Sequence, residues 1–273
     1  MRGLFVCFVL FFLYLRPAWA ASLSVLVTIP PQREWVREIG GDQVEVTVLV
    51  PPGANPHTYE LSPRQLKVVQ RARLYAAVGS GLEFEIAWLG RIEKLNPKLL
   101  VVDCSRGVET LEGDPHIWLS LKNAKTMVRN ILNGLCKIDP SRASLYRKRA
   151  SSYLAKLDSL DGEIRRLLDP YRGRAFLTFH PSWGYFARDY GLRQMVIEQG
   201  GKEPSPRALM ALIRRAREAG IKVVFVSPQF DRRAAEAIAR ELQGRVVPLD
   251  PLAPDYLKNM RRVAEEIARS FSP

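Results

Sequence analysis

The chain has 273 residues, of which 47% are hydrophobic and 25% charged, so it contains enough apolar side chains for one large core or two smaller ones. Its 41 Lys and Arg residues exceed its 28 Asp and Glu residues and give a formal net charge of +13. These basic residues are scattered along the expected helices instead of gathering around aromatic side chains, so we expect solvated helix faces and no nucleic-acid partner.

The first twenty residues have the pattern of a secretory signal peptide. A positive start at Arg2 precedes an almost entirely apolar run from Leu4 to Leu15, and Ala18-Trp19-Ala20 has the small-x-small form of a cleavage site. Cleavage near Ala20 predicts a periplasmic protein, and no cysteine lies at this point to carry a lipid anchor. No later apolar run approaches the roughly 20 residues that a membrane-spanning helix needs.

Short β-branched runs alternate with amphipathic helices in both halves of the remaining chain. The expected strands are Ser24–Thr28, Val44–Val50, Leu74–Val78 and Leu99–Asp103, then Ala175–Phe179, Met195–Glu198, Val223–Val226 and Val246–Leu249. The helices between them include Gln32–Ile39, Pro63–Arg71 and Phe84–Leu95, then Pro206–Ala219, Arg232–Leu242 and Asp255–Phe271. This alternation is typical of parallel sheets flanked by helices, so we expect an α/β fold with two lobes, residues 21–138 and 170–273.

A single long helix is expected between the lobes, within residues 139–169. Its apolar positions recur at spacings of 4 and 3 and form one narrow stripe. They are Tyr146, Ala150, Tyr153, Leu157, Leu160, Ile164 and Leu167. At 1.5 Å per residue, the stretch from Ser141 to Leu168 would extend roughly 42 Å. A helix of this length between two lobes is expected to be a rigid bridge that limits hinge motion.

The chain has three histidines, and each stands next to a proline, in Pro56-His57, Pro115-His116 and His180-Pro181. Each follows an expected strand, either directly, as His180 does, or after a loop. Because ligands bind at the carboxyl ends of the strands in open parallel sheets, we expect the three side chains to meet in the cleft between the lobes. Imidazole is the commonest metal ligand, and the shared setting favours one metal site over three unrelated histidines.

One carboxylate would complete a tetrahedral shell around such a metal. Asp250 ends the expected strand Val246–Leu249 and is the candidate, with a capping or turn role as the alternative. Glu60, three residues after His57, is a further candidate to approach the metal in place of water. Asp114 either fixes a turn or accepts a hydrogen bond from a histidine.

The cysteines outside the signal peptide are Cys104 and Cys136. In an exported protein they either pair as a disulfide or are separate small apolar residues, and their spacing does not decide between these alternatives.

Several segments together resemble one known family. The strings NPHTYELSP, DPHIWLS, FHPSWGYFARDYGL, EPSP and VVPLDPL are similar, in order and spacing over the whole mature length, to those of the zinc- and manganese-binding periplasmic proteins of bacterial ABC importers (cluster A-I, the ZnuA/TroA-like family). The resemblance implies two α/β lobes joined by one backbone helix and a metal held by His57, His116, His180 and Asp250. Many zinc-binding members insert a histidine-rich loop before the second motif, whereas residues 105–113 here are short and contain no histidine.

Three nitrogen ligands and one oxygen ligand suit Zn²⁺ better than Mn²⁺, so we expect capture of Zn²⁺, with Mn²⁺ or Fe²⁺ as alternatives. The resemblance implies that a monomer delivers the ion to an ABC transporter permease with its ATPase and has no enzymatic activity. A periplasmic metal chaperone would share the site without the transporter. An exported zinc-dependent hydrolase is the alternative of a different class, but it needs an open coordination position, which Asp250 would close.

Overall fold

The computed structural model describes residues 22–198 and 204–272, in which two four-stranded sheets are formed. The first has the order β2-β1-β3-β4, with strands β1 (Leu23–Val27), β2 (Val44–Val48), β3 (Leu74–Ala77) and β4 (Leu100–Asp103). The second repeats this order as β6-β5-β7-β8, with strands β5 (Ala175–Thr178), β6 (Arg193–Val196), β7 (Val223–Val226) and β8 (Arg245–Pro248). All pairings are parallel, which confirms the predicted α/β fold with two lobes.

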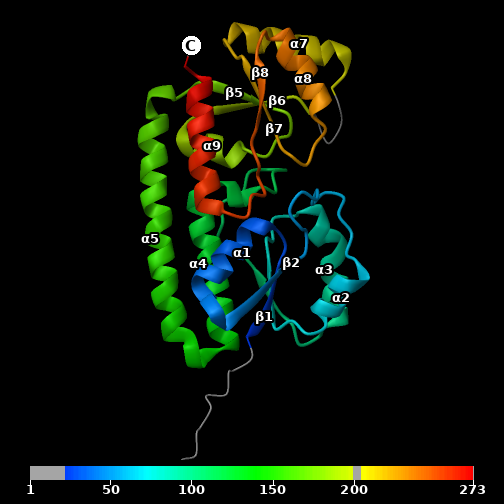
Figure 1. Cartoon of the computed structure of the whole chain (residues 1–273), viewed down its shortest axis with the longest axis vertical. Helices are drawn as coiled ribbons and strands as arrows, with labels where there is room; N and C mark the ends of the chain where they lie inside the picture. The colour runs from blue at the N-terminus through cyan, green and yellow to red at the C-terminus, as the bar shows by residue number, and fades with distance from the viewer. Residues whose placement is uncertain (1–21, 199–203, 273) are drawn as a thin grey trace, which may run out of the picture.

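Helices flank both sheets (Figure 1). The first half contains α1 (Pro30–Gly40), α2 (Pro63–Val69), α3 (Glu83–Leu95) and α4 (Leu121–Ile138). The second half contains α6 (Gly184–Tyr190), α7 (Pro206–Glu218), α8 (Arg232–Glu241) and α9 (Tyr256–Ser270). Helices α4 and α6 are additional to those expected from the sequence. The carboxyl ends of the strands lead into the loops that carry the candidate ligands.

The predicted long helix is α5 (Ala143–Leu168), which runs alongside both lobes (Figure 1). It packs against α1 and α4 of the first lobe and against α9 of the second lobe. The predicted apolar stripe is buried as far as Ile164, but its last buried residue is Leu168, while Leu167 is 39% exposed. The 4-3 spacing averages 3.5 residues per turn and an α-helix has 3.6, so the buried stripe drifts by one residue over this length.

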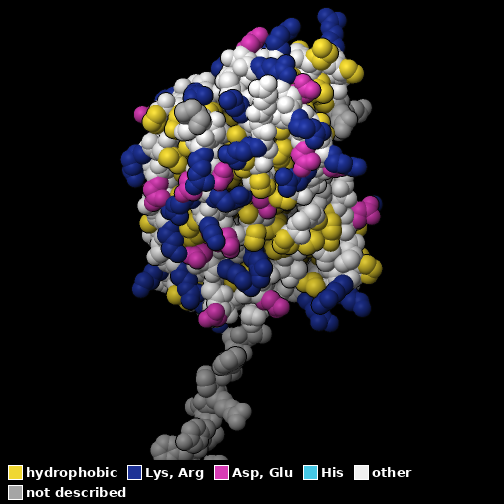
Figure 2. Space-filling view, turned by 45° about the horizontal axis from the view of Figure 1, so that its top comes forward, with side chains coloured by type: hydrophobic (Ala, Val, Ile, Leu, Met, Phe, Trp, Pro, Cys, Tyr) yellow, Lys and Arg dark blue, Asp and Glu magenta, His cyan; other side chains and the backbone are white. Residues whose placement is uncertain are grey.

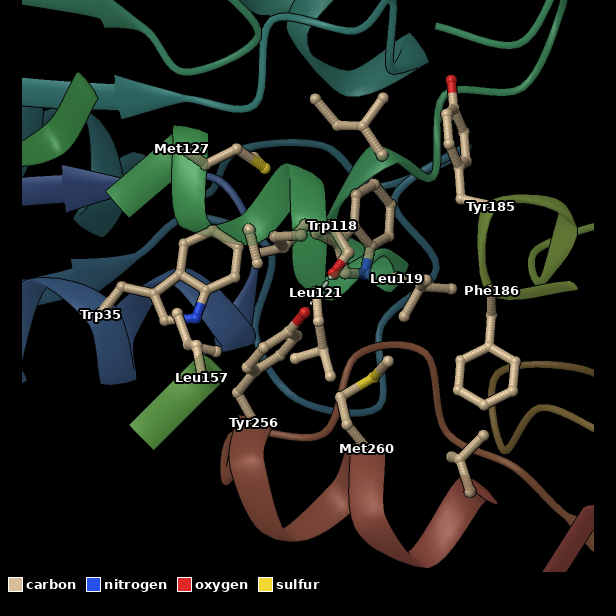
Figure 3. Close-up of a cluster of buried hydrophobic side chains, with 14 of the residues drawn as sticks. Trp35, Trp118, Leu119, Leu121, Met127, Leu157, Tyr185, Phe186, Tyr256 and Met260 are labelled. Carbon is tan, nitrogen blue, oxygen red and sulfur yellow. Dashed lines mark hydrogen bonds between the residues drawn. The ribbon is translucent and has the colours of Figure 1, made fainter. Parts of the chain in front are cut away.

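The hydrophobic core beside α5 is continuous between the two lobes (Figure 3). Trp35 of α1 and Tyr256 of α9 pack edge to face, with ring centroids 5.1 Å apart. Two hydrogen bonds involve Trp118: its Nε1 donates to the Pro251 carbonyl at 2.7 Å, and its own carbonyl accepts from the Tyr256 hydroxyl at 2.6 Å. The lobes are therefore joined by direct packing as well as by α5.

The basic residues are distributed over the surface. On the face shown in Figure 2, Lys and Arg side chains are spread among acidic ones. Several are paired between elements, such as Arg261 with Glu163 at 2.7 Å and Lys156 with Glu38 at 2.8 Å. This distribution agrees with the expectation of solvated helix faces.

Cys104 is buried, Cys136 is half-buried, and both are free thiols, so the disulfide alternative is wrong. None of the described helices combines the length and the apolar character that crossing a membrane requires. The predicted signal peptide, residues 1–20, lies outside the described residues.

Candidate metal centre

The first two candidate histidines are presented by the same local turn. His57 lies in the loop between β2 and α2, and its backbone N–H donates to Asn55 Oδ1 at 2.9 Å. His116 lies after β4, and its backbone N–H donates to Asp114 Oδ1, also at 2.9 Å. In each case a proline, Pro56 or Pro115, lies between the residue whose side chain accepts and the histidine whose N–H donates. Proline has a fixed φ and no N–H of its own, which favours a turn closed by a side chain. The sequences Asn-Pro-His and Asp-Pro-His thus form the same turn, and each turn places a histidine side chain at the site.

His180 is presented differently, because it follows β5 almost directly and precedes its proline. Its carbonyl accepts a hydrogen bond from the Ser182 backbone N–H at 2.9 Å. Its ring stacks on Phe230, in the loop between β7 and α8, with centroids 4.6 Å apart and an interplanar angle of 27°. The imidazole is therefore held by the second lobe on one face and is only 8% exposed.

The structure brings the three histidines together between the lobes. A ligand atom from each of His57, His116 and His180 lies within 4.8 Å of one from each of the others. Their ring centroids are separated by 5.8, 5.0 and 5.2 Å. They line a pocket of about 550 Å³ to which both lobes contribute. This is the convergence that the strand-end argument predicts.

Each imidazole is oriented by a carboxylate. The three Nδ1···O contacts are His57 to Glu83 Oε2 at 2.7 Å, His116 to Asp114 Oδ1 at 2.8 Å, and His180 to Glu198 Oε2 at 2.8 Å. A carboxylate oxygen accepts a hydrogen bond, so each contact favours a proton on Nδ1 and a lone pair on Nε2. Metal-ligating histidines typically have this arrangement, in which the carboxylate fixes both the tautomer and the ring orientation.

The environment of His180 favours its neutral form. Burial, together with the neighbouring His116 ring, lowers the pKa of His180 to about 4, although the Glu198 carboxylate opposes this shift. The Nε2 atom of His180 is buried and has no hydrogen-bond partner among the residues that the structure describes. A neutral imidazole with such a nitrogen fits a metal ligand, because ligating histidines must be deprotonated.

Asp250, the predicted fourth ligand, follows β8 but does not belong to the group of donors that lie within 4.8 Å of one another among the described residues. Its Oδ1 atom accepts hydrogen bonds from Gln229 Nε2 and from the Leu252 backbone N–H, both at 2.9 Å. Glu60 is exposed and does not line the pocket.

The sequence reasoning did not single out Glu83 or Glu198. Glu83 is the first residue of α3, shortly after β3, and Glu198 follows β6. Both satisfy the criterion that selected the histidines, since they lie just beyond the carboxyl ends of strands. Asp114 performs both of the roles that were left as alternatives, because its carboxylate closes the turn and contacts the His116 ring.

Two parallel α/β lobes with three imidazoles converging between them define a metal-binding substrate receptor. The family model for the zinc-uptake complex component A, periplasmic (ZnuA) matches residues 25–270, and the chain belongs to this family. A crystal structure of ZnuA is similar with a TM-score of 0.89 and 41% identity, covering 92% of this chain and 100% of that one. A zinc-bound deletion mutant of ZnuA gives a TM-score of 0.88 and 40% identity, covering 92% and 99%.

A curated relative leads to the same family. The high-affinity zinc uptake system protein ZnuA of Bacillus subtilis is 29% identical over 254 residues, which cover 85% of this chain and 79% of that protein. Membership places the chain among the extracytoplasmic metal-binding receptors of ABC uptake systems and not among enzymes. The alternative of an exported zinc-dependent hydrolase is therefore wrong.

Proposed function

We propose that this protein captures one Zn²⁺ ion in the interlobe cleft and delivers it to an ABC transporter permease with its ATPase. The observation that supports this most directly is the set of three buried or half-buried imidazoles, each with Nδ1 on a carboxylate, whose ligand atoms lie within 4.8 Å of one another. The ligands come from two lobes, so a small relative movement of the lobes breaks the shell and releases the ion.

Asp250 is our candidate for the fourth ligand. The two hydrogen bonds that its side chain accepts both go to Oδ1. The other oxygen, Oδ2, is the atom that would coordinate the metal. Together with His57, His116 and His180 it would give a closed shell of three nitrogens and one oxygen.

Zinc is favoured over manganese by the chemistry of these ligands. Imidazole suits Zn²⁺, whereas Mn²⁺ prefers carboxylate, carbonyl and water oxygens. A relative with 40% identity also has zinc bound. Mn²⁺ and Fe²⁺ are the alternatives. The protein is proposed to work as a periplasmic monomer, after cleavage of its signal peptide near Ala20.

The test is a calorimetric titration of the metal-free mature protein with Zn²⁺ and with Mn²⁺. We expect one ion per chain and tighter binding of Zn²⁺, and we expect a deletion strain to grow poorly under zinc limitation. Added zinc should restore growth. Restoration by manganese and not by zinc would assign the protein to manganese uptake, and growth independent of both metals would refute the transport role.

The carboxylate behind His180 provides a second test. Glu198→Gln keeps the size of the side chain but removes its charge. Its amide oxygen accepts more weakly from His180 Nδ1 than a carboxylate does, and its NH₂ group can donate to Nδ1 instead, so the Nε2 lone pair of His180 is favoured less strongly. We expect Zn²⁺ affinity to fall about 10- to 100-fold, as is typical when a partner of a ligating histidine is lost. Glu112→Gln is the matched control, because Glu112 lines the same pocket but is exposed. Equal affinities of the two variants would contradict the assigned role of Glu198.

A further inference from the structure

The first turn of α9, in the second lobe, has no cap from its own segment. Asp255 precedes the helix, but its side chain accepts no capping hydrogen bond. The first amides of any helix lack partners within the helix and must find an acceptor elsewhere. Here the acceptor is Glu34 of α1, in the first lobe: Oε2 accepts from the Tyr256 backbone N–H, and Oε1 accepts from the Leu257 backbone N–H at 3.4 Å.

The same carboxylate also contacts the long helix α5. The hydroxyl of the buried Tyr153 donates to Glu34 Oε1 at 2.6 Å. Glu34 therefore joins one element of the first lobe, the bridging helix and one element of the second lobe through a single side chain. A negative charge at the start of α9 is also favourable for the helix dipole.

The capped turn lies close in sequence to the second lobe's candidate ligand. The Asp250 carbonyl accepts from Asn259 Nδ2, on α9, at 2.7 Å. The neighbouring Pro251 carbonyl accepts from Trp118 Nε1, on the first lobe's side of the interface, at 2.7 Å. The segment from Asp250 to the first turn of α9 is thus held against the first lobe at both of its ends.

We propose that Glu34 is a positioning residue for the metal site, a role that rests on the proposed function. By capping α9 from the opposite lobe, it holds the second lobe at the angle at which His180 meets His57 and His116. Without this cap, the two lobes sample other angles. The angle that brings the three histidines together is then populated for less of the time, which lowers the apparent affinity for Zn²⁺. Glu34 itself contacts none of the three histidines.

The test compares two carboxylates on the same helix. Glu38 lies one turn after Glu34 on α1 and pairs with Lys156 of α5, but it makes no hydrogen bond to α9. We expect Glu34→Ala to raise both the dissociation rate and the Kd of Zn²⁺ about 10-fold, which corresponds to a productive lobe angle that is populated about one tenth of the time. Glu38→Ala should leave both within about 2-fold of wild type. Glu34→Gln retains one acceptor oxygen and should fall between wild type and Glu34→Ala.

Hydrogen exchange adds a local readout. In Glu34→Ala, the amides of Tyr256 and Leu257 should exchange faster than in wild type, and in Glu38→Ala they should not. A purely structural role predicts a lower melting temperature of Glu34→Ala with Zn²⁺ affinity unchanged, and that result would overturn the proposal. If Glu34→Ala does not fold, an unchanged Kd in Glu34→Gln has the same meaning. Wild-type protein that binds no Zn²⁺ would refute the proposed function itself.

Discussion

Replacement of His116 with Ala should weaken Zn²⁺ binding by at least about 100-fold. Four ligands typically share about 10–16 kcal/mol of binding free energy, so the loss of one costs roughly 3 kcal/mol. His116 is 4% exposed and its Nδ1 lies 2.8 Å from Asp114, so the alanine variant loses a ligand that the protein holds in a fixed orientation. A chelator competition assay on the purified variant measures the change in Kd, and far-UV circular dichroism shows whether the variant is folded.

The matched control is Thr58→Ala, because Thr58 lines the same pocket, is exposed, and follows His57 directly. Its Zn²⁺ affinity should stay within about 2-fold of wild type, as expected for an exposed residue outside the ligand set. His57→Ala and His180→Ala should each lose affinity to a degree similar to His116→Ala. Unchanged stoichiometry and Kd in His116→Ala would remove this residue from the site and with it the three-histidine assignment.

Replacement of Trp118 with Ala should produce the largest loss of stability among single changes at the lobe interface. Trp118 is fully buried, donates to Pro251 and lies in the core that both lobes share. Truncation of a buried Trp typically costs about 3–5 kcal/mol, which lowers the melting temperature of a protein of this size by about 10 °C. Differential scanning calorimetry of the zinc-free protein measures both the temperature and the shape of the transition.

Two further variants show how much of this loss of stability comes from the hydrogen bond and how much is specific to the lobe interface. Trp118→Phe keeps most of the volume but removes the indole N–H and leaves the Pro251 carbonyl without this donor, so the loss should be about 1–3 kcal/mol. Trp88→Ala, in α3, removes a half-buried ring that packs on a separate cluster of the first lobe and should cost less than Trp118→Ala. Since the core is shared, we expect one transition for both lobes. Two separate transitions in the wild-type protein would show that the lobes unfold independently.

Local patterns in the sequence were sufficient for the architecture of this protein. The alternation of β-branched runs with amphipathic helices predicts the strands, the helices and hence two parallel sheets, because the apolar period along each element is a local property of the sequence. The proline-flanked histidines could be selected for a similar reason: parallel strands bring their carboxyl ends to one edge, so residues at strand ends meet. The spacing of apolar residues predicted the long helix. It placed the last buried residue at Leu167, whereas the structure buries Leu168.

The partners of the candidate ligands were decided only by the tertiary structure. The position of Glu83 after β3 agrees with a place at the site but does not show that its partner is His57. Glu34 lies within α1, and no local pattern marks it as the cap of α9. These contacts join residues 26 and 222 positions apart in the chain. Such pairs depend on how whole elements pack, and packing is set by the sum of many weak contacts over the shared core rather than by any short motif.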